Sequence, residues 1–432
     1  MMSPLIGGLQ KTTNYRVVLP FYIYASFGFL LGTCLLLFST EAVGAHYFNP
    51  HTLAITHTMA LAWGTMIIFG ASHQLLPVLV EGKLDSDPLA YLTFAFTAVG
   101  IPFLVYGFYV FDMGLPLQLG AILINIGVIC YLANVLASSF NKNSKNVHAW
   151  YVITATLWLF ATTFFGLLLV LNFRTPILSK NSVEYLSVHA HLGIVGWFLL
   201  MVIGVGSRLI PMFLISKYTN DKVLWLVFAL LNGALIGFLL VYFADLSTML
   251  LYIPILMGLI AILLFGRHCY KAYKARIRKS IDPQVKTSLI SVAQMLLPFL
   301  ALIATLVLLP GGQSPEIAIL YGFCIFFGWL TAIILGMTFK TMPFIIWNKV
   351  YHNQAHKGRT PTPKEIFNNS IYNVMLYSYL GGFIIFILGI LLFNQILLKG
   401  GALALLIAAI LYVYNVMITA CHKSKQNEYP NE

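Results

Sequence analysis

Apolar stretches of roughly twenty residues recur along the whole chain, and this recurrence limits the possible folds more than any other feature of the sequence. Each stretch can cross about 30 Å of hydrocarbon as an α-helix that rises about 1.5 Å per residue. A helix also satisfies its backbone hydrogen bonds within its own segment, as lipid requires. We count twelve stretches, with approximate bounds 17–39, 54–80, 89–111, 115–137, 150–172, 189–214, 222–243, 247–267, 289–309, 317–346, 372–393 and 397–419. The sequence therefore predicts an all-α integral membrane protein with twelve transmembrane helices.

Composition agrees with this class. Hydrophobic residues make up 59% of the 432 positions and charged residues only 9%, whereas about a quarter of the residues in a soluble domain are charged. None of the connecting segments is long enough to form a soluble domain. The whole chain, 1–432, is therefore predicted to be a single membrane domain in contact with the lipid bilayer.

The positive charges predict the orientation, because short loops rich in Lys and Arg stay in the cytoplasm. With both termini cytoplasmic, only Arg174, Lys180 and Lys399 of the 25 Lys and Arg residues fall on the other side. We expect a protein of a bacterial-type inner membrane in this orientation. The net charge of +12 lies mostly in 267–286 and 340–364. A basic surface against anionic headgroups explains it; docking of an acidic soluble partner is the alternative, and nucleic acid is not expected.

The second, sixth and tenth stretches share one pattern of residues with identical spacings. The pattern reads His57, Trp63, Gly70 and Pro77; then His191, Trp197, Gly204 and Pro211; then Phe323, Trp329, Gly336 and Pro343. Such a repeat predicts three quartets of helices, approximately 12–145, 146–285 and 286–425, around a pseudo-threefold axis. We expect the glycines to allow close helix contacts and the prolines to lie near helix ends, where a lost hydrogen bond costs little.

His57 and His191 are the strongest candidates for a functional site. A histidine inside a membrane span is costly, so its default interpretation is functional. The two residues occupy equivalent positions of the repeat, about one turn below the outer boundary. Two imidazoles from two helices commonly hold a heme iron, with the second ring nitrogen oriented by a carbonyl or a hydroxyl. We predict His57 and His191 as ligands of a heme iron; the alternative is a pair of structural histidines near the headgroups.

His189 is the alternative to His191 as second ligand. It lies two residues away, about 200° around the helix, so only one of the two rings can face the axis. The repeat favours His191, whereas His189 is expected to face the cleft between quartets. The chain has no CxxCH motif, which excludes covalently attached c-type heme and leaves b-type heme as the expected cofactor.

Other polar residues give weaker signals. His73, Gln74, Arg208 and Lys340 lie shortly before the repeat prolines. We expect them to extend toward the cytoplasmic surface, with a substrate or proton path as the alternative. The remaining histidines are expected to be solvated: His46, His51, His148, His268, His352, His356 and His422. The five cysteines have no spacing typical of zinc sites or disulfides.

The stretch from His57 to Pro77, HTMALAWGTMIIFGASHQLLP, resembles the second helix of the heme-copper oxidase catalytic subunit, particularly in the nitric oxide reductase and cbb3-type branches. The stretch from His189 to Phe198 is similar to the heme proteins named NnrS, which are implicated in nitric oxide resistance. The resemblance implies twelve helices in three arcs and a heme ligand at His57. It also implies respiratory-chain subunits or a redox partner as partners.

The chain departs from the oxidase pattern at the binuclear centre. The family's tenth helix carries two heme-ligating histidines, whereas Phe323 and its neighbours offer none. The family's copper ligands on the seventh helix are also missing, so copper and oxygen reduction by the usual mechanism are not expected. The leading hypothesis is a divergent heme-binding member, active in respiratory electron transfer or nitric oxide handling. The alternatives are a copper or small-solute transporter, in which Met59 and Met201 assist the histidines, and a cofactor-free subunit of a respiratory complex.

Overall fold

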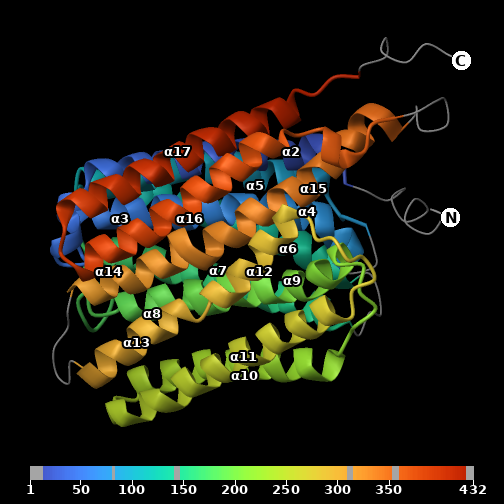
Figure 1. Cartoon of the computed structure of the whole chain (residues 1–432). Helices are drawn as coiled ribbons and strands as arrows, with labels where there is room; N and C mark the ends of the chain where they lie inside the picture. The colour runs from blue at the N-terminus through green and yellow to red at the C-terminus, as the bar shows by residue number, and fades with distance from the viewer. Residues whose placement is uncertain (1–12, 80–82, 141–145, 309–314, 353–359, 425–432) are drawn as a thin grey trace, which may run out of the picture.

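The computed structural model describes residues 13–79, 83–140, 146–308, 315–352 and 360–424. Over these residues it contains twelve helical crossings that are long and apolar enough to span a membrane, and no β-strand (Figure 1). The predicted all-α, twelve-span membrane protein is thereby confirmed. We call the end at which α2 begins the proximal end of the bundle, and the opposite end the distal end.

Five crossings precede the middle of the chain: α2 (Tyr15–Phe38); α3, η3 and α4 (Pro50–His57, Thr58–Thr65, Met66–Leu79); α5 (Asp87–Tyr109); α6 (Leu115–Phe140); and α7 (Val147–Asn172). Seven follow: α8, η4 and α9 (Leu186–His191, Leu192–Leu199, Leu200–Phe213); α10 (Asp221–Phe243); α11 (Tyr252–Lys274); α12 and α13 (Pro283–Gln294, Leu297–Leu308); α14, η6 and α15 (Pro315–Phe323, Cys324–Leu330, Thr331–Tyr351); α16 (Asn369–Leu391); and α17 (Gln395–Ala420). Short 3₁₀ turns are η2 (Thr40–Gly44), η5 (Thr248–Leu251) and η8 (Pro363–Glu365).

The turns between the third and fourth helix of each quartet have the same backbone conformation. Phe111, Asp245 and Phe393 each adopt a positive φ, of 57°, 50° and 51°. The next residue in each turn donates its backbone N–H to a carbonyl five residues back, which closes the helix end in a Schellman motif. The third helix of each quartet therefore ends in the same way, although the residue with the positive φ differs in type.

The second, sixth and tenth crossings also share an irregularity that the sequence did not reveal. Each contains a π-helical segment, η3, η4 or η6, that begins directly after His57, His191 or Phe323. Gly64, Phe198 and Leu330, which are equivalent positions of the repeat, lie together: a Cβ on Gly64 would be 2.9 Å from the Phe198 ring and 3.0 Å from the Leu330 side chain. The three crossings thus meet at one axis. The boundaries of the quartets stay predictions.

Two of the repeat tryptophans hydrogen-bond from one crossing to the next around this axis. The Trp63 indole donates to Thr331 Oγ1 at 3.0 Å, and the Trp197 indole donates to Thr65 Oγ1 at 3.1 Å. Leu199 occupies the position equivalent to the two threonines and has no hydroxyl group. Two of the three repeat tryptophans therefore hydrogen-bond to a neighbouring crossing among the described residues.

The repeat glycines have the packing role that the sequence predicts. A Cβ on Gly70 would lie 2.8 Å from Phe21 Cβ on α2, and one on Gly336 would lie 2.5 Å from Ser288 Oγ on α12. Gly204 meets Tyr151 of α7 at a distance too short for any Cβ. Each glycine thus lets its crossing touch the first helix of the same quartet.

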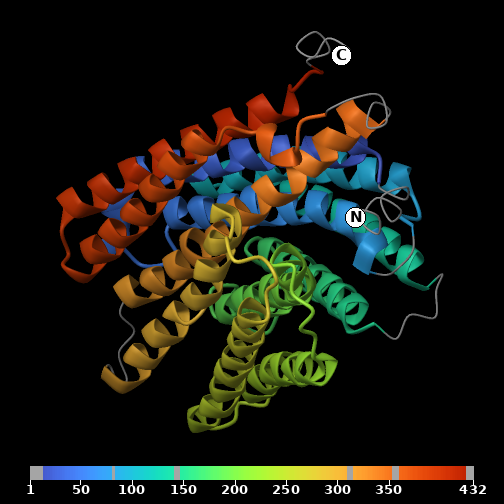
Figure 2. The ribbon, with the colours of Figure 1, turned by 45° about the vertical axis from the view of Figure 1, so that its right-hand side comes forward.

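The hairpin of α10 and α11 lies at the edge of the bundle (Figure 2). Each of these helices has only 28% of its most apolar window buried, against 67% for the second, sixth and tenth crossings. This hairpin is therefore the least enclosed part of the described bundle.

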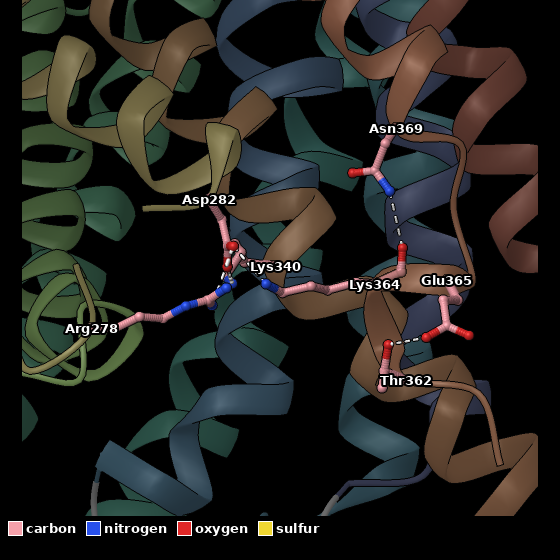
Figure 3. A network of polar contacts seen from close by, with 7 residues as sticks. All are labelled: Arg278, Asp282, Lys340, Thr362, Lys364, Glu365 and Asn369. Atoms are coloured by element: carbon pink, nitrogen blue, oxygen red, sulfur yellow. Dashed lines mark hydrogen bonds and ion pairs between the residues drawn. The ribbon is translucent and has the colours of Figure 1, made fainter. Parts of the chain in front are cut away.

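An ion-pair network joins three segments at the proximal end (Figure 3). Asp282, directly before α12, accepts hydrogen bonds from Lys340 Nζ of α15 at 2.7 Å and from Lys364 Nζ of η8 at 2.6 Å. Arg278 lies 3.3 Å from the same carboxylate. Lys340 is 9% exposed, so the expectation that it extends to the surface is wrong: a carboxylate meets it inside the protein.

Replacing Asp282 with Asn should lower the free energy of unfolding by about 1–3 kcal/mol at neutral pH, because a buried ammonium group loses its anion. Burial raises the pKa of Asp282, but the hydrogen bonds and charges of Lys340 and Lys364 outweigh burial, and the net shift is downward. The stabilisation is therefore present above the unfolded-state value of about 3.9 and is lost as the pH falls through the lower folded-state pKa.

Thermal unfolding in detergent, followed from pH 7 into acid, measures this difference. Glu365→Gln is the matched control, since that exposed carboxylate accepts only from the Thr362 hydroxyl among the described contacts. Equal stability of the two variants at neutral pH contradicts the assigned role of Asp282.

Candidate cofactor site

A cavity of about 450 Å³ lies between the second, sixth and tenth crossings, at their distal ends. This volume is within the range of about 300–1,000 Å³ that is usual for ligand pockets. Its walls are mostly aliphatic and aromatic, and its main hydrogen-bonding side chains are His57, His189, His191, Tyr321 and Asn125. All three histidines predicted from the sequence therefore line a single cavity.

His57 lines the cavity and makes one ring hydrogen bond among the described residues. Its Nδ1 lies 2.8 Å from the Leu53 carbonyl oxygen. A carbonyl can only accept, so Nδ1 carries the proton and Nε2 keeps its lone pair. The ring also stacks on Phe108, with centroids 4.4 Å apart. Both contacts fix the orientation of the imidazole, as is usual for a metal-ligating histidine.

His189 is the histidine that faces His57. The two ring centroids are 6.3 Å apart and the ring planes differ by 21°. Two imidazoles that coordinate one metal ion from opposite sides, with bonds of about 2.0–2.1 Å, have their centres roughly 6 Å apart. His189 Nδ1 is buried without a hydrogen-bond partner among the described residues, although the backbone of Thr162 lies near the ring.

The His189 ring occupies a niche on α7 that a glycine creates. A Cβ on Gly166 would lie 2.8 Å from His189 Cε1, closer than real side chains approach. α7 therefore accepts the imidazole only because position 166 has no side chain.

His191 has a different partner. Its Nδ1 donates to the Ser187 carbonyl at 2.7 Å, as His57 does to Leu53. Its Nε2, however, lies 3.3 Å from the Tyr321 hydroxyl of α14. Since Nε2 has no proton in this tautomer, Tyr321 is the donor. The lone pair that is free on His57 is thus occupied on His191.

The internal repeat relates these two pairs. His57 and His191 are equivalent, and so are His189 and Tyr321, each two residues before the first position of the pattern. Each histidine at the first position of the pattern therefore contacts the residue that lies two positions before the pattern in the next quartet: His57 contacts His189, and His191 contacts Tyr321. The third first-position residue, Phe323, instead packs among Phe327, Phe383 and Phe386. The two equivalent contacts are thus imidazole with imidazole and imidazole with phenol, whereas Phe323 packs on aromatic residues of its own quartet.

The helical spacing correctly predicted that His189 and His191 face different neighbours. The choice of His191 as second heme ligand stays a prediction. Sequence reasoning missed Tyr321, Gly166 and Asn125; the Asn125 Oδ1 is buried with no hydrogen-bond partner in the described part of the chain. For Tyr321 a signal was present, since it occupies the position equivalent to His189.

Polar residues at the proximal end do not join this cavity. His73 is 1% exposed, has no partner at either ring nitrogen among the described residues, and packs on Phe21 and Tyr131. Arg208 is exposed, as expected. The expectation that His148 and His268 are solvated is wrong, because they are 6% and 2% exposed within helix contacts. His356 lies outside the described residues.

Replacing Tyr321 with Phe should change the environment of His191 without changing that of His57. The phenol is the only hydrogen-bond donor to His191 Nε2 in the described structure, whereas His57 Nε2 receives none. Nitrogen NMR of histidine-labelled protein at neutral pH should show a shift for His191 Nε2 alone. An equal shift of both resonances, or of neither, contradicts the described pairing.

Comparison with protein-family models and with curated proteins finds no match for this chain. The resemblance of its helices to heme-copper oxidases and to NnrS-type proteins therefore stays an expectation, and the function is argued from the cavity.

Proposed function

We propose that this integral membrane protein binds one b-type heme in the distal cavity, with His57 and His189 as the two iron ligands. One observation carries the proposal: two nearly parallel imidazoles, with centres 6.3 Å apart, face each other from different quartets inside an apolar cavity. The separation suits two ligands of one iron ion.

The residues of the cavity fit a heme in three respects. The apolar walls suit the macrocycle, the Leu53 carbonyl holds His57 in the tautomer that leaves Nε2 free, and His189 has a buried nitrogen in need of a partner. His191 fits less well, because Tyr321 already occupies its Nε2. A bound heme would supply one-electron exchange, tuned by its axial ligands and by burial.

The role that fits this site is respiratory electron transfer or nitric oxide handling, as the resemblance of helices two and six implies. We also propose a bacterial-type inner membrane with both termini cytoplasmic, and a redox partner or respiratory subunits as partners. In this orientation the heme lies toward the outer side of the membrane. Oxygen reduction at a binuclear centre is not part of the proposal, since Phe323 packs among phenylalanines where the family has ligands.

Optical spectra of the purified protein, oxidised and dithionite-reduced, test the proposal. We expect a Soret band with sharp reduced bands, lost in His57→Ala and in His189→Ala and retained in His191→Ala. Loss in His191→Ala with retention in His189→Ala would return the second ligand to His191. A colourless protein from heme-replete cells would contradict heme binding and favour the transporter or the cofactor-free subunit.

A second variant tests the niche that holds His189. Gly166→Ala should reduce heme content at least tenfold or convert the spectrum to high spin, because the new methyl group displaces the imidazole by a few tenths of an ångström or more. Gly322→Ala is the matched control, since it lines the same cavity and its Cβ would meet open space. Equal spectra for the two variants would show that position 166 does not control the ligand.

A further inference from the structure

The first and third quartets use the same asparagine clamp at their proximal ends. Asn134 of α6 accepts from the backbone N–H of Ser86 at 3.1 Å and donates to its carbonyl at 2.9 Å. Asn415 of α17 makes the same two bonds to Asn368, both at 2.9 Å. In each case the amide ties the fourth helix to the residue that caps the third helix. The fourth helix therefore holds the start of the third.

The second quartet has His268 at the corresponding position of α11. The alignment is supported by the residue three positions before Asn134, His268 and Asn415. This residue is a fully buried aromatic side chain in each quartet: Tyr131, Phe265 and Tyr412. The residue that caps the third helix in this quartet is Asn220, before α10. Neither ring nitrogen of His268 has a hydrogen-bond partner among the described residues, although the side chain is 2% exposed. The clamp is present in two quartets and open in the third.

The groups around His268 come from every element of the second quartet. Tyr218, two residues before Asn220, packs on the imidazole with centroids 5.2 Å apart. Asp221 of α10 and His148 of α7 are within electrostatic range, and the backbone of Ser207 in α9 lies beside the ring. Farther out are Arg208, which acts on His148, and Lys271, which lies over the Tyr218 ring. The surroundings contain one carboxylate and two fixed cations.

A neutral imidazole can accept the backbone N–H as the amide oxygen does, whereas a protonated one cannot. The neutral ring has one acceptor nitrogen, which can take the role of the Asn134 or Asn415 Oδ1. The imidazolium ion has two donors and no acceptor, so it cannot accept the backbone N–H of Asn220. Asp221 would attract the imidazolium ion and His148 would oppose it, but neither restores the missing acceptor. Protonation therefore removes the only form of residue 268 that can close the clamp.

We propose that His268 is a proton-controlled latch for the α10–α11 hairpin, closed onto Asn220 when neutral and open when protonated. The hairpin is the least buried part of the bundle, so a single added hydrogen bond changes its local stability more readily than that of an enclosed helix pair. The proposal is independent of heme binding, because it concerns the opposite end of the bundle.

Hydrogen exchange of the full-length protein in lipid nanodiscs tests the latch, with protection corrected for intrinsic rates from pH 8 to pH 5, where imidazoles ordinarily titrate. We expect the amide protection at the proximal ends of α10 and α11 to fall about tenfold as the pH falls, corresponding to the one hydrogen bond lost from the Asn220 N–H. The α5–α6 hairpin, with its Asn134 clamp, is the internal reference and should not change.

Two substitutions exchange the clamps. His268→Asn should make α10–α11 protection high and independent of pH. Asn134→His should transfer the pH dependence to α5–α6. The proposal is overturned if wild type and His268→Asn have the same pH profile, or if Asn134→His leaves α5–α6 unchanged. The two variants are independent, so failure of one to fold leaves the other as a test.

Discussion

The close contact of the second, sixth and tenth crossings at one axis is the constraint on which the rest of the structure depends. In lipid there is little hydrophobic force between helices, and association relies on close packing and polar contacts. Gly64 supplies the first, since no side chain separates it from Phe198 and Leu330. The Trp63 and Trp197 indoles supply the second. Because these crossings are fixed to one another, the residues that follow the same pattern along each of them are fixed too.

This arrangement explains why one cavity holds side-chain pairs of different chemistry. The repeat fixes which positions face each other across neighbouring quartets, and the residue type at each position is then free to differ. His57 with His189 offers free nitrogen atoms for a metal ion. His191 with Tyr321 is already joined. A shared backbone geometry thus supports one open and one closed version of the same contact.

The sequence predicted the fold well because apolar length and the repeated Trp, Gly and Pro positions are local signals. Its predictions about individual polar residues were less reliable. Lys340 and His268 are both basic residues in the proximal halves of their crossings, where such side chains ordinarily reach toward water. One is buried because Asp282, far away in the chain, meets it; the other is buried by Tyr218 and the helices of its quartet. Such partners come from tertiary structure, and neither spacing nor composition contains them. For the same reason the sequence could not decide which histidine lies opposite His57. The helical period separates His189 from His191, but it does not say which neighbour each one contacts.

The three π-helical segments separate two parts of each crossing. A π turn contains one more residue than an α turn. The side chains before it are therefore rotated about the helix axis relative to those after it. In all three crossings the axis contacts lie within or after the segment, and the site residue lies just before it. Gain or loss of one residue there would rotate the site side chain by about 100° and leave the axis in register. Descendants of this fold can therefore re-aim the residues of the cavity, and so change what it binds, without rebuilding the core.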